Sequence, residues 1–292
     1  MQFSTSDDVS LWTATTGQTG VVGRGRNRRQ PSPAAAPVVI LHGGPGTWDS
    51  HATLARMVDD LTVVHRFDQR GCGRSGASDN LSMARFAQDI DELRAFWGHD
   101  KIVVVGHSFG ATLAVTYGAL YPDRVAGVVY LDGVGIGDWR SGDQKVRESR
   151  MTPAQMARLD ELSERPRTSD EEIEFRVLVW FPDFADPDHA MEWALEDASV
   201  DLPISWTVNR ALSNEISSWP DSRKCADVAA IPAPVTFIHG EGDPRPYTAV
   251  QALAEHARQP SFHLIPNAGH SPWRERPDAV RKILRDVVLA VG

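Results

Sequence analysis

The Gly-x-Ser-x-Gly motif centred on Ser108 is the segment of the sequence best suited to chemistry, because its serine lies between a strand pattern and a helix pattern. An apolar run over 102–105 precedes the motif, and a helix-like run over 111–120 follows it. A strand-to-helix turn of this kind holds a serine in a strained conformation with its hydroxyl exposed. The helix N-terminus beside it favours developing negative charge. We therefore predict that Ser108 is a nucleophile.

A serine hydroxyl needs a base to take its proton, and the base needs an acid to orient it. Where this motif joins a strand to a helix, the order along the chain is serine, acid, histidine. His270, in the loop after the last predicted strand, is the best candidate for the base. Asp243, in a glycine-rich turn, is the favoured acid. Asp132 at the end of an earlier strand is its rival, and we expect Glu241 to be solvated.

Hydrogen-bond donors are also needed, because the tetrahedral intermediate of acyl transfer carries an oxyanion. The backbone N–H of Phe109, directly after the serine, is the first candidate. The second donor should come from the glycine-rich loop 42–46, where the backbone can approach a substrate closely. Gly44 is the favoured donor there, and Gly43 is the second choice. This chemistry requires no metal ion and no organic cofactor.

The elements that position these residues alternate between strands and helices, and each strand is a nearly continuous apolar run. This pattern is typical of an α/β fold with a parallel sheet covered on both faces. Strands are predicted at 38–41, 61–67, 102–105, 125–131, 235–239 and 262–265, and helices near 50–60, 83–97, 111–120, 247–258 and 277–288. The alternation stops over 138–225, a helix-like stretch rich in tryptophan. We predict a core of residues 1–137 and 226–292 and a helical lid of residues 138–225.

The amino-acid composition argues against several classes of binding partner. The formal net charge of −9 argues against nucleic acid. The two cysteines make no disulfide framework, and no Cys/His spacing is typical of a zinc site. We find no signal-peptide pattern and no apolar run of the roughly 18 residues that span a bilayer. These features favour a cytoplasmic protein with no membrane partner, and they leave its oligomeric state open.

Three segments carry a resemblance to a known family: 42–46 (His-Gly-Gly-Pro-Gly), 68–75 (Asp-Gln-Arg-Gly-Cys-Gly-Arg-Ser) and 106–114 around the serine. The chain resembles the α/β-hydrolase superfamily, and within it the proline iminopeptidase family of serine aminopeptidases. The resemblance implies an α/β-hydrolase fold with an inserted lid, and release of N-terminal residues, often proline, from short peptides. The flanks of the serine, His107 and Phe109, differ from the Gly and Trp that are common in that family.

The predicted lid is strongly acidic and could bind a substrate amine. Residues 169–201 include eleven Asp or Glu residues and a single basic residue, Arg176. Such a surface attracts a cationic group, including a free N-terminus. Glu215 is the preferred amine-binding residue, and Glu196 is the next. The alternative substrate is a small-molecule ester or lactone, hydrolysed by the same three residues.

Overall fold

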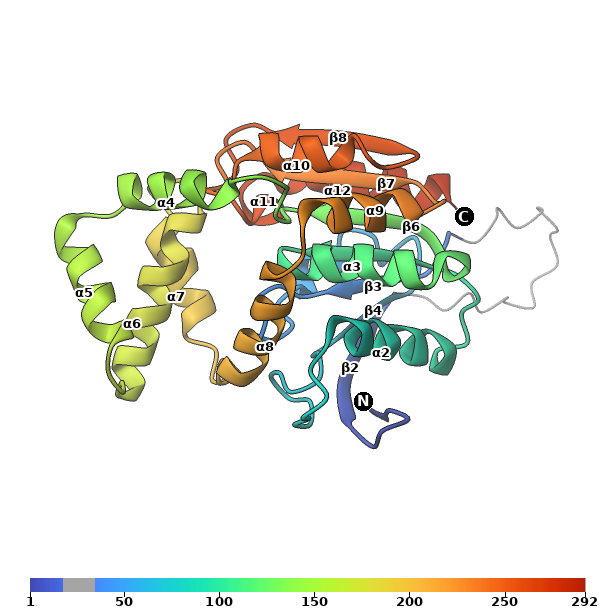
Figure 1. Cartoon of the computed structure of the whole chain (residues 1–292), viewed down its shortest axis with the longest axis horizontal. Coiled ribbons are helices and arrows are strands. Elements are labelled where there is room, and N and C mark those ends of the chain that lie inside the picture. Colours follow the sequence, from blue (N-terminus) through green and yellow to red (C-terminus); the bar gives the residue numbers. More distant parts are fainter. Residues whose placement is uncertain (18–34, 292) are drawn as a thin grey trace.

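The computed structural model of the chain describes residues 1–17 and 35–291. An eight-stranded sheet with the order β1-β2-β4-β3-β5-β6-β7-β8 forms its centre (Figure 1). The strands are β1 (Gln2–Ser4), β2 (Ser10–Thr16), β3 (Val38–Leu41), β4 (Val64–Phe67), β5 (Ile102–His107), β6 (Val125–Leu131), β7 (Val235–Gly240) and β8 (Pro260–Ile265). The β1–β2 and β2–β4 pairs are antiparallel and the other neighbours are parallel. The predicted α/β fold with a mostly parallel sheet is confirmed.

Helices cover both faces of the sheet, because successive side chains of a strand point to opposite faces. In β3, Val39 and Leu41 pack in one apolar cluster, while Val38 and Ile40 pack in the other. The first cluster includes side chains of α2 (Met83–Phe96), α3 (Phe109–Leu120), α9 (Asp221–Ala230) and α10 (Tyr247–Ala254). The second includes side chains of α1 (Ala52–Ala55), α11 (Pro272–Glu275) and α12 (Pro277–Ala290). The short 3-10 helix η1 (Pro122–Arg124) leads into β6.

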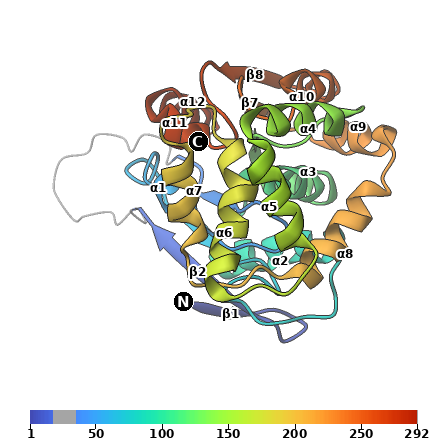
Figure 2. The same cartoon turned by 90° about the vertical axis from the view of Figure 1, so that its left-hand side faces the viewer.

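A helical insertion separates β6 from β7 and lies beyond one end of the sheet (Figures 1 and 2). It consists of α4 (Trp139–Arg150), α5 (Pro153–Ser163), α6 (Ser169–Trp180), η2 (Phe181–Asp183), α7 (Ala190–Ala198) and α8 (Trp206–Ser217), and α9 follows. Leu162, Phe175, Leu178 and Ala194 belong to an apolar cluster of its own. Helix α9 packs against α3 of the core, so the lid boundary predicted at residue 225 falls inside a helix of the core face.

Two elements are shorter than the sequence pattern predicts. Only Ala52–Ala55 of the predicted helix 50–60 is α-helical. The predicted strand 61–67 begins at Val64, because the N–H groups of Leu61 and Thr62 donate to the Val58 carbonyl at 2.9 and 3.2 Å and continue the preceding turn. None of the described helices is long and apolar enough to cross a lipid bilayer.

Candidate active site

Ser108 occupies the turn between β5 and α3 with φ +57° and ψ −120°, a conformation that non-glycine residues seldom adopt. Glycines on either side make this turn possible. A Cβ atom on Gly106 would lie 2.0 Å from the Gly110 carbonyl oxygen, and a Cβ on Gly110 would lie 2.3 Å from the Leu41 carbonyl oxygen. Both contacts are far below van der Waals distance, so only glycine fits at either position. The structure therefore places Ser108 in the strained turn that its motif predicts.

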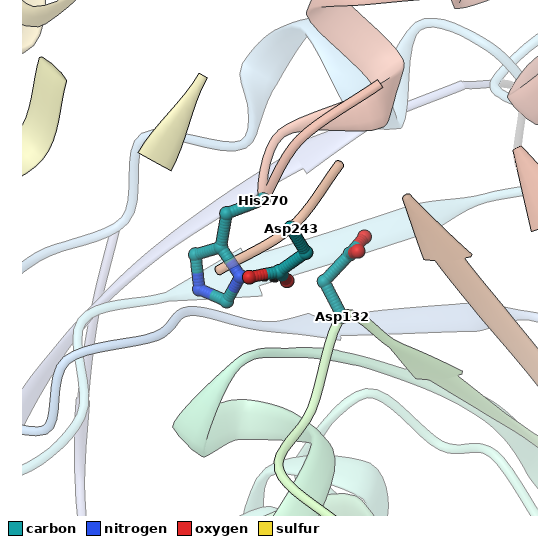
Figure 3. A group of neighbouring side chains, drawn as sticks. All are labelled: Asp132, Asp243 and His270. Carbon is teal, nitrogen blue, oxygen red and sulfur yellow. Dashed lines mark hydrogen bonds and ion pairs between the residues drawn. The ribbon is translucent and has the colours of Figure 1, made fainter. Parts of the chain in front are cut away.

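His270 and Asp243 lie in loops that follow β8 and β7, and their side chains meet (Figure 3). The Nδ1 atom of His270 lies 2.6 Å from Oδ2 of Asp243. The other carboxylate oxygen, Oδ1, accepts the backbone N–H of Arg245 at 2.9 Å, with the Arg245 guanidinium 3.3 Å away. Burial alone would raise the pKa of Asp243, but the charges of His270 and Arg245 lower it well below its usual range. Asp243 is therefore an anion that can orient an imidazole.

The backbone of His270 is fixed from two sides. Its N–H donates to the carbonyl oxygen of Asp183, in η2, at 2.8 Å. Its carbonyl oxygen accepts a hydrogen bond from Nε2 of His107 at 2.9 Å. The inserted helices and the serine turn therefore both position this histidine.

A cavity of about 750 Å³ lies between the sheet and the inserted helices, and both Ser108 and His270 line it. Its wall is rich in aromatic side chains, namely those of Trp48, Phe175, Trp180, Phe184, Trp193, Trp206 and Trp273. The Ser108 hydroxyl forms no hydrogen bond with any of the described residues. Catalytic hydrogen bonds are often long in free enzymes and tighten when substrate binds. The geometry thus leaves the serine hydroxyl open to the cavity.

The loop over Ser108 contains the candidate oxyanion donors. Gly43 and Gly44 both line the cavity, and a Cβ atom on Gly43 would approach the Cβ of Ser108 to 3.0 Å. Gly44 has φ +119°, which favours glycine. Phe109 is the first residue of α3, so its N–H belongs to the unpaired donors of a helix N-terminus. The oxyanion roles of Gly44 and Phe109 stay predictions.

The segment 68–75 braces this loop. Gln69 donates from its backbone N–H to Nε2 of His42 at 3.0 Å and from its side-chain amide to the His42 carbonyl oxygen at 2.9 Å. The buried carboxylate of Asp68 accepts the N–H groups of Asp49 at 2.7 Å and Arg74 at 2.8 Å. Arg70 lies elsewhere and pairs with Asp89 of α2 at 2.6 Å. The glycine loop is therefore held by a polar network behind it.

The predicted amine-binding residues lie in different places. Glu196 lines the cavity and is ion-paired with Arg274. Asp197 beside it also lines the cavity and lies 2.9 Å from the same guanidinium. Glu215 does not line the cavity, because its carboxylate accepts the backbone N–H of Met83, at the start of α2, at 2.9 Å. Of the two predicted amine-binding residues, the structure therefore places Glu196 in the cavity lining, together with the neighbouring Asp197, and places Glu215 outside it.

The other two acidic candidates do not contact the imidazole. Asp132 is fully buried, and its Oδ1 accepts the N–H of Gly240 at 2.7 Å. Glu241 is exposed, as expected for a solvated residue. Of the three acids considered, Asp243 is the one hydrogen-bonded to His270.

The sequence did not predict the ion pairs that join the inserted helices to the loop after β7, which carries Asp243. Asp183 of η2 pairs with Arg245 at 2.5 Å and also with Arg147 of α4. All three residues line the cavity. They lie far apart along the chain, and no local motif connects them. Their pairing fixes the insertion against the loop that carries Asp243.

The chain is similar to known proteins in sequence and in fold. A family model described as the alpha/beta hydrolase family matches residues 38–283. The proline iminopeptidase of Heyndrickxia coagulans is 23% identical over 270 residues, which cover 87% of this chain and 91% of that protein. A thermophilic esterase from Thermogutta terrifontis superposes with a TM-score of 0.72 at 22% identity, covering 100% of this chain and 98% of the esterase. The proline iminopeptidase of Mycobacterium smegmatis gives a TM-score of 0.70 at 18% identity, with 97% and 96% covered. With a family model that spans most of its length, the chain belongs to the alpha/beta hydrolase family.

Proposed function

We propose that the protein is a serine hydrolase that forms an acyl-enzyme at Ser108. The observation that carries this proposal is the 2.6 Å contact between His270 and Asp243 beside the cavity into which the serine turn opens. The Asp243 carboxylate accepts a hydrogen bond from Nδ1 of His270. The imidazole therefore carries a proton on Nδ1 and has its lone pair on Nε2. That nitrogen is the one available to take the serine proton.

The reaction then proceeds in two steps, acylation of Ser108 and hydrolysis of the acyl-enzyme. His270 takes the proton of Ser108 as its oxygen attacks the substrate carbonyl, and the N–H groups of Phe109 and Gly44 stabilise the oxyanion. The imidazolium gives its proton to the departing amine or alcohol, which leaves an ester on the serine. Water attacks that ester with His270 again as the base. The imidazolium then gives this proton to the Ser108 oxygen as its bond to the acyl group breaks, which releases the carboxylic acid and the free serine.

The proposed substrate is a short peptide with a free N-terminal residue of the proline type. Glu196 and Asp197 carry two negative charges against the single positive charge of Arg274, so this part of the cavity wall keeps one net negative charge. Such a site attracts an ammonium group. Aromatic walls suit a pyrrolidine ring. Relatives of similar length named proline iminopeptidase support the same class.

One observation favours a second candidate, a small-molecule ester or lactone. Each carboxylate described in the cavity lining, namely those of Asp183, Glu196 and Asp197, already contacts an arginine. A neutral substrate needs no free carboxylate. The esterase among the solved structures shares the fold of this chain.

Comparing matched substrates separates the two candidates. Proline and alanine naphthylamides with free amines are assayed beside their N-acetylated analogues and short acyl esters. We expect kcat/KM for proline naphthylamide to exceed that of its N-acetylated analogue by about tenfold or more, because one charge contact contributes about 1.4 kcal/mol or more. Hydrolysis of the esters alone, with every aminoacyl amide inert, would replace the peptidase with the esterase.

A further inference from the structure

Asp132 is a second carboxyl group beside the acid of the proposed triad, and the proposed reaction does not use it. It follows β6 with φ +45°, and its side chain is fully buried. Asp132, Asp243 and His270 each offer an oxygen or nitrogen atom, and these atoms lie within 4.8 Å of one another. Figure 3 shows Asp243 between Asp132 and the ring of His270. Any charge on Asp132 would therefore act directly on the triad.

The two carboxyl groups differ in how well their oxygens are satisfied. Asp243 accepts hydrogen bonds from the His270 ring and the Arg245 backbone N–H, and it is ion-paired with the Arg245 guanidinium. Asp132 receives one donor, the N–H of Gly240, and its Oδ2 is buried with no hydrogen-bond partner among the described residues. Two buried carboxyl groups this close share one proton, because two adjacent negative charges in a low-dielectric site repel strongly. The proton belongs on the group with fewer donors.

The position of His239, on β7, independently favours a proton on Asp132. Its Nε2 donates to the Arg245 carbonyl oxygen at 2.9 Å, and burial lowers its pKa, so the ring is neutral with a lone pair on Nδ1. That Nδ1 has no partner among the described residues and lies 3.8 Å from Oδ1 of Asp132. A carboxylate would set negative charge against this lone pair, whereas a carboxylic acid would not. Burial and the charge of Asp243 likewise raise the pKa of Asp132 well above its usual range, against the smaller opposing effects of the Gly240 N–H and Arg245.

We propose that Asp132 is held as a neutral carboxylic acid beside Asp243 and is a reserve orienting acid, which becomes the anion facing His270 when Asp243 is removed. This inference rests on the proposed triad. Loss of Asp243 removes the like charge, so Asp132 releases its proton to solvent. A negative charge within 4.8 Å of His270 then stabilises the imidazolium that forms when the serine proton is taken.

Infrared difference spectroscopy tests the protonation without any assay of activity. We expect wild-type protein at neutral pH to show the C=O stretch of a protonated carboxylic acid, and Asp132→Asn to lose that band. The asparagine side chain has the shape of the neutral acid, so the fold should tolerate it. Identical carboxylic-acid bands in the two proteins would overturn the proposal.

Kinetics test the reserve role in two backgrounds, with a short acyl ester as substrate. Asp243→Ala should keep activity above that of Ser108→Ala, and this activity should rise with pH as Asp132 ionises. Adding Asp132→Asn to Asp243→Ala should remove the part of this pH dependence that comes from Asp132 and leave the part that comes from the base. The fold-loss in kcat that Asp132→Asn causes in this background should be roughly ten times the fold-loss that it causes in the wild-type background. Equal fold-losses in the two backgrounds would refute the reserve role.

Failure of the proposed function gives a different result. Wild type and Ser108→Ala would then hydrolyse the ester equally, while the infrared band of Asp132 would be unaffected. If the double variant does not fold, the infrared comparison of wild type with Asp132→Asn still decides the protonation. Loss of the carboxylic-acid band of Asp132 in Asp243→Ala at neutral pH then supports the reserve role, and persistence of that band refutes it.

Discussion

His107 donates from Nε2 to the backbone carbonyl oxygen of His270 at 2.9 Å, and so ties the serine turn to the loop that carries the proposed base. Its Nδ1 lies 3.2 Å from Nε2 of His51, and its ring packs edge-on against Trp273 with centroids 4.6 Å apart. Burial lowers the pKa of His107, so the ring is neutral and has one donor and one acceptor, both in use. Position 107 is therefore a structural link between Ser108 and His270.

Replacing His107 with Phe should lower kcat by about tenfold, because the carbonyl of His270 loses its donor and the loop is less firmly placed. Steady-state kinetics on a short acyl ester measure this effect. His107→Gln keeps a donor, so its kcat should lie between those of wild type and His107→Phe. Unchanged kcat in His107→Phe would show that this hydrogen bond does not position the base.

Gly110→Ala should destabilise the protein by about 3 kcal/mol and lower activity, because its Cβ would lie 2.3 Å from the Leu41 carbonyl oxygen. Gly98→Ala is the matched control. Gly98 also lies at a helix end, with φ +76°, but nothing lies within 4 Å of an added Cβ there. Gly98→Ala should lower the free energy of unfolding by about 1 kcal/mol, from backbone strain alone. Urea unfolding of both variants measures the difference, and equal losses would contradict the close approach at Gly110.

Stability should depend on pH through the buried histidine His65. Burial and the neighbouring His99 lower its pKa to about 3, against an ordinary value of 6.5. Between these values the unfolded chain binds a proton that the folded chain does not, so the free energy of unfolding decreases as pH falls from 6.5 to about 3. In His65→Gln this slope should be smaller by about 1.4 kcal/mol per pH unit.

Thr15→Val is the control for the histidine, because the Thr15 hydroxyl lies 2.9 Å from Nδ1 of His65 and has no titration of its own in this range. It should change the free energy of unfolding but not its slope with pH. Denaturant titrations at several pH values between 3 and 7 provide both quantities. A slope in His65→Gln equal to that of wild type would show that His65 takes up protons equally in both states.

Asp197→Asn should raise KM for proline naphthylamide by about tenfold and leave KM for its N-acetylated analogue unchanged, because only the free amine needs the charge. Glu215→Gln is the matched control, since this lid acid contacts the backbone of Met83 and lies outside the cavity lining. Its two KM values should equal those of wild type. Equal increases for both substrates in Asp197→Asn would remove Asp197 from amine binding.

Much of the fold and the centre of the site could be predicted from local sequence. The turn at Ser108 depends on two glycines four positions apart, Gly106 and Gly110. The alternation of strand and helix patterns predicted the sheet, because each apolar run is short and bounded by turns. The order of serine, acid and histidine pointed to Asp243 and His270, which the structure brings to 2.6 Å. Their catalytic roles remain predictions.

The lid could not be predicted as well, because its contacts join residues that are distant in sequence. Glu215 and Glu196 both lie on amphipathic helices that contribute to the cavity wall, and composition alone does not show which of the two carboxylates faces the cavity. The pairing of Asp183 with Arg245 depends on how η2 packs against the loop after β7. Tertiary packing, which local propensity does not encode, decides both.

Labelling with a fluorophosphonate, read by mass spectrometry of the tryptic peptides, tests the proposed nucleophile most directly. The folded wild-type protein should gain one phosphonyl group on the peptide that contains Ser108, and His270→Ala should react at least about 100-fold more slowly. Ser108→Ala should gain none. Unlabelled wild type, or label of the same extent in Ser108→Ala, would contradict nucleophilic catalysis by this serine.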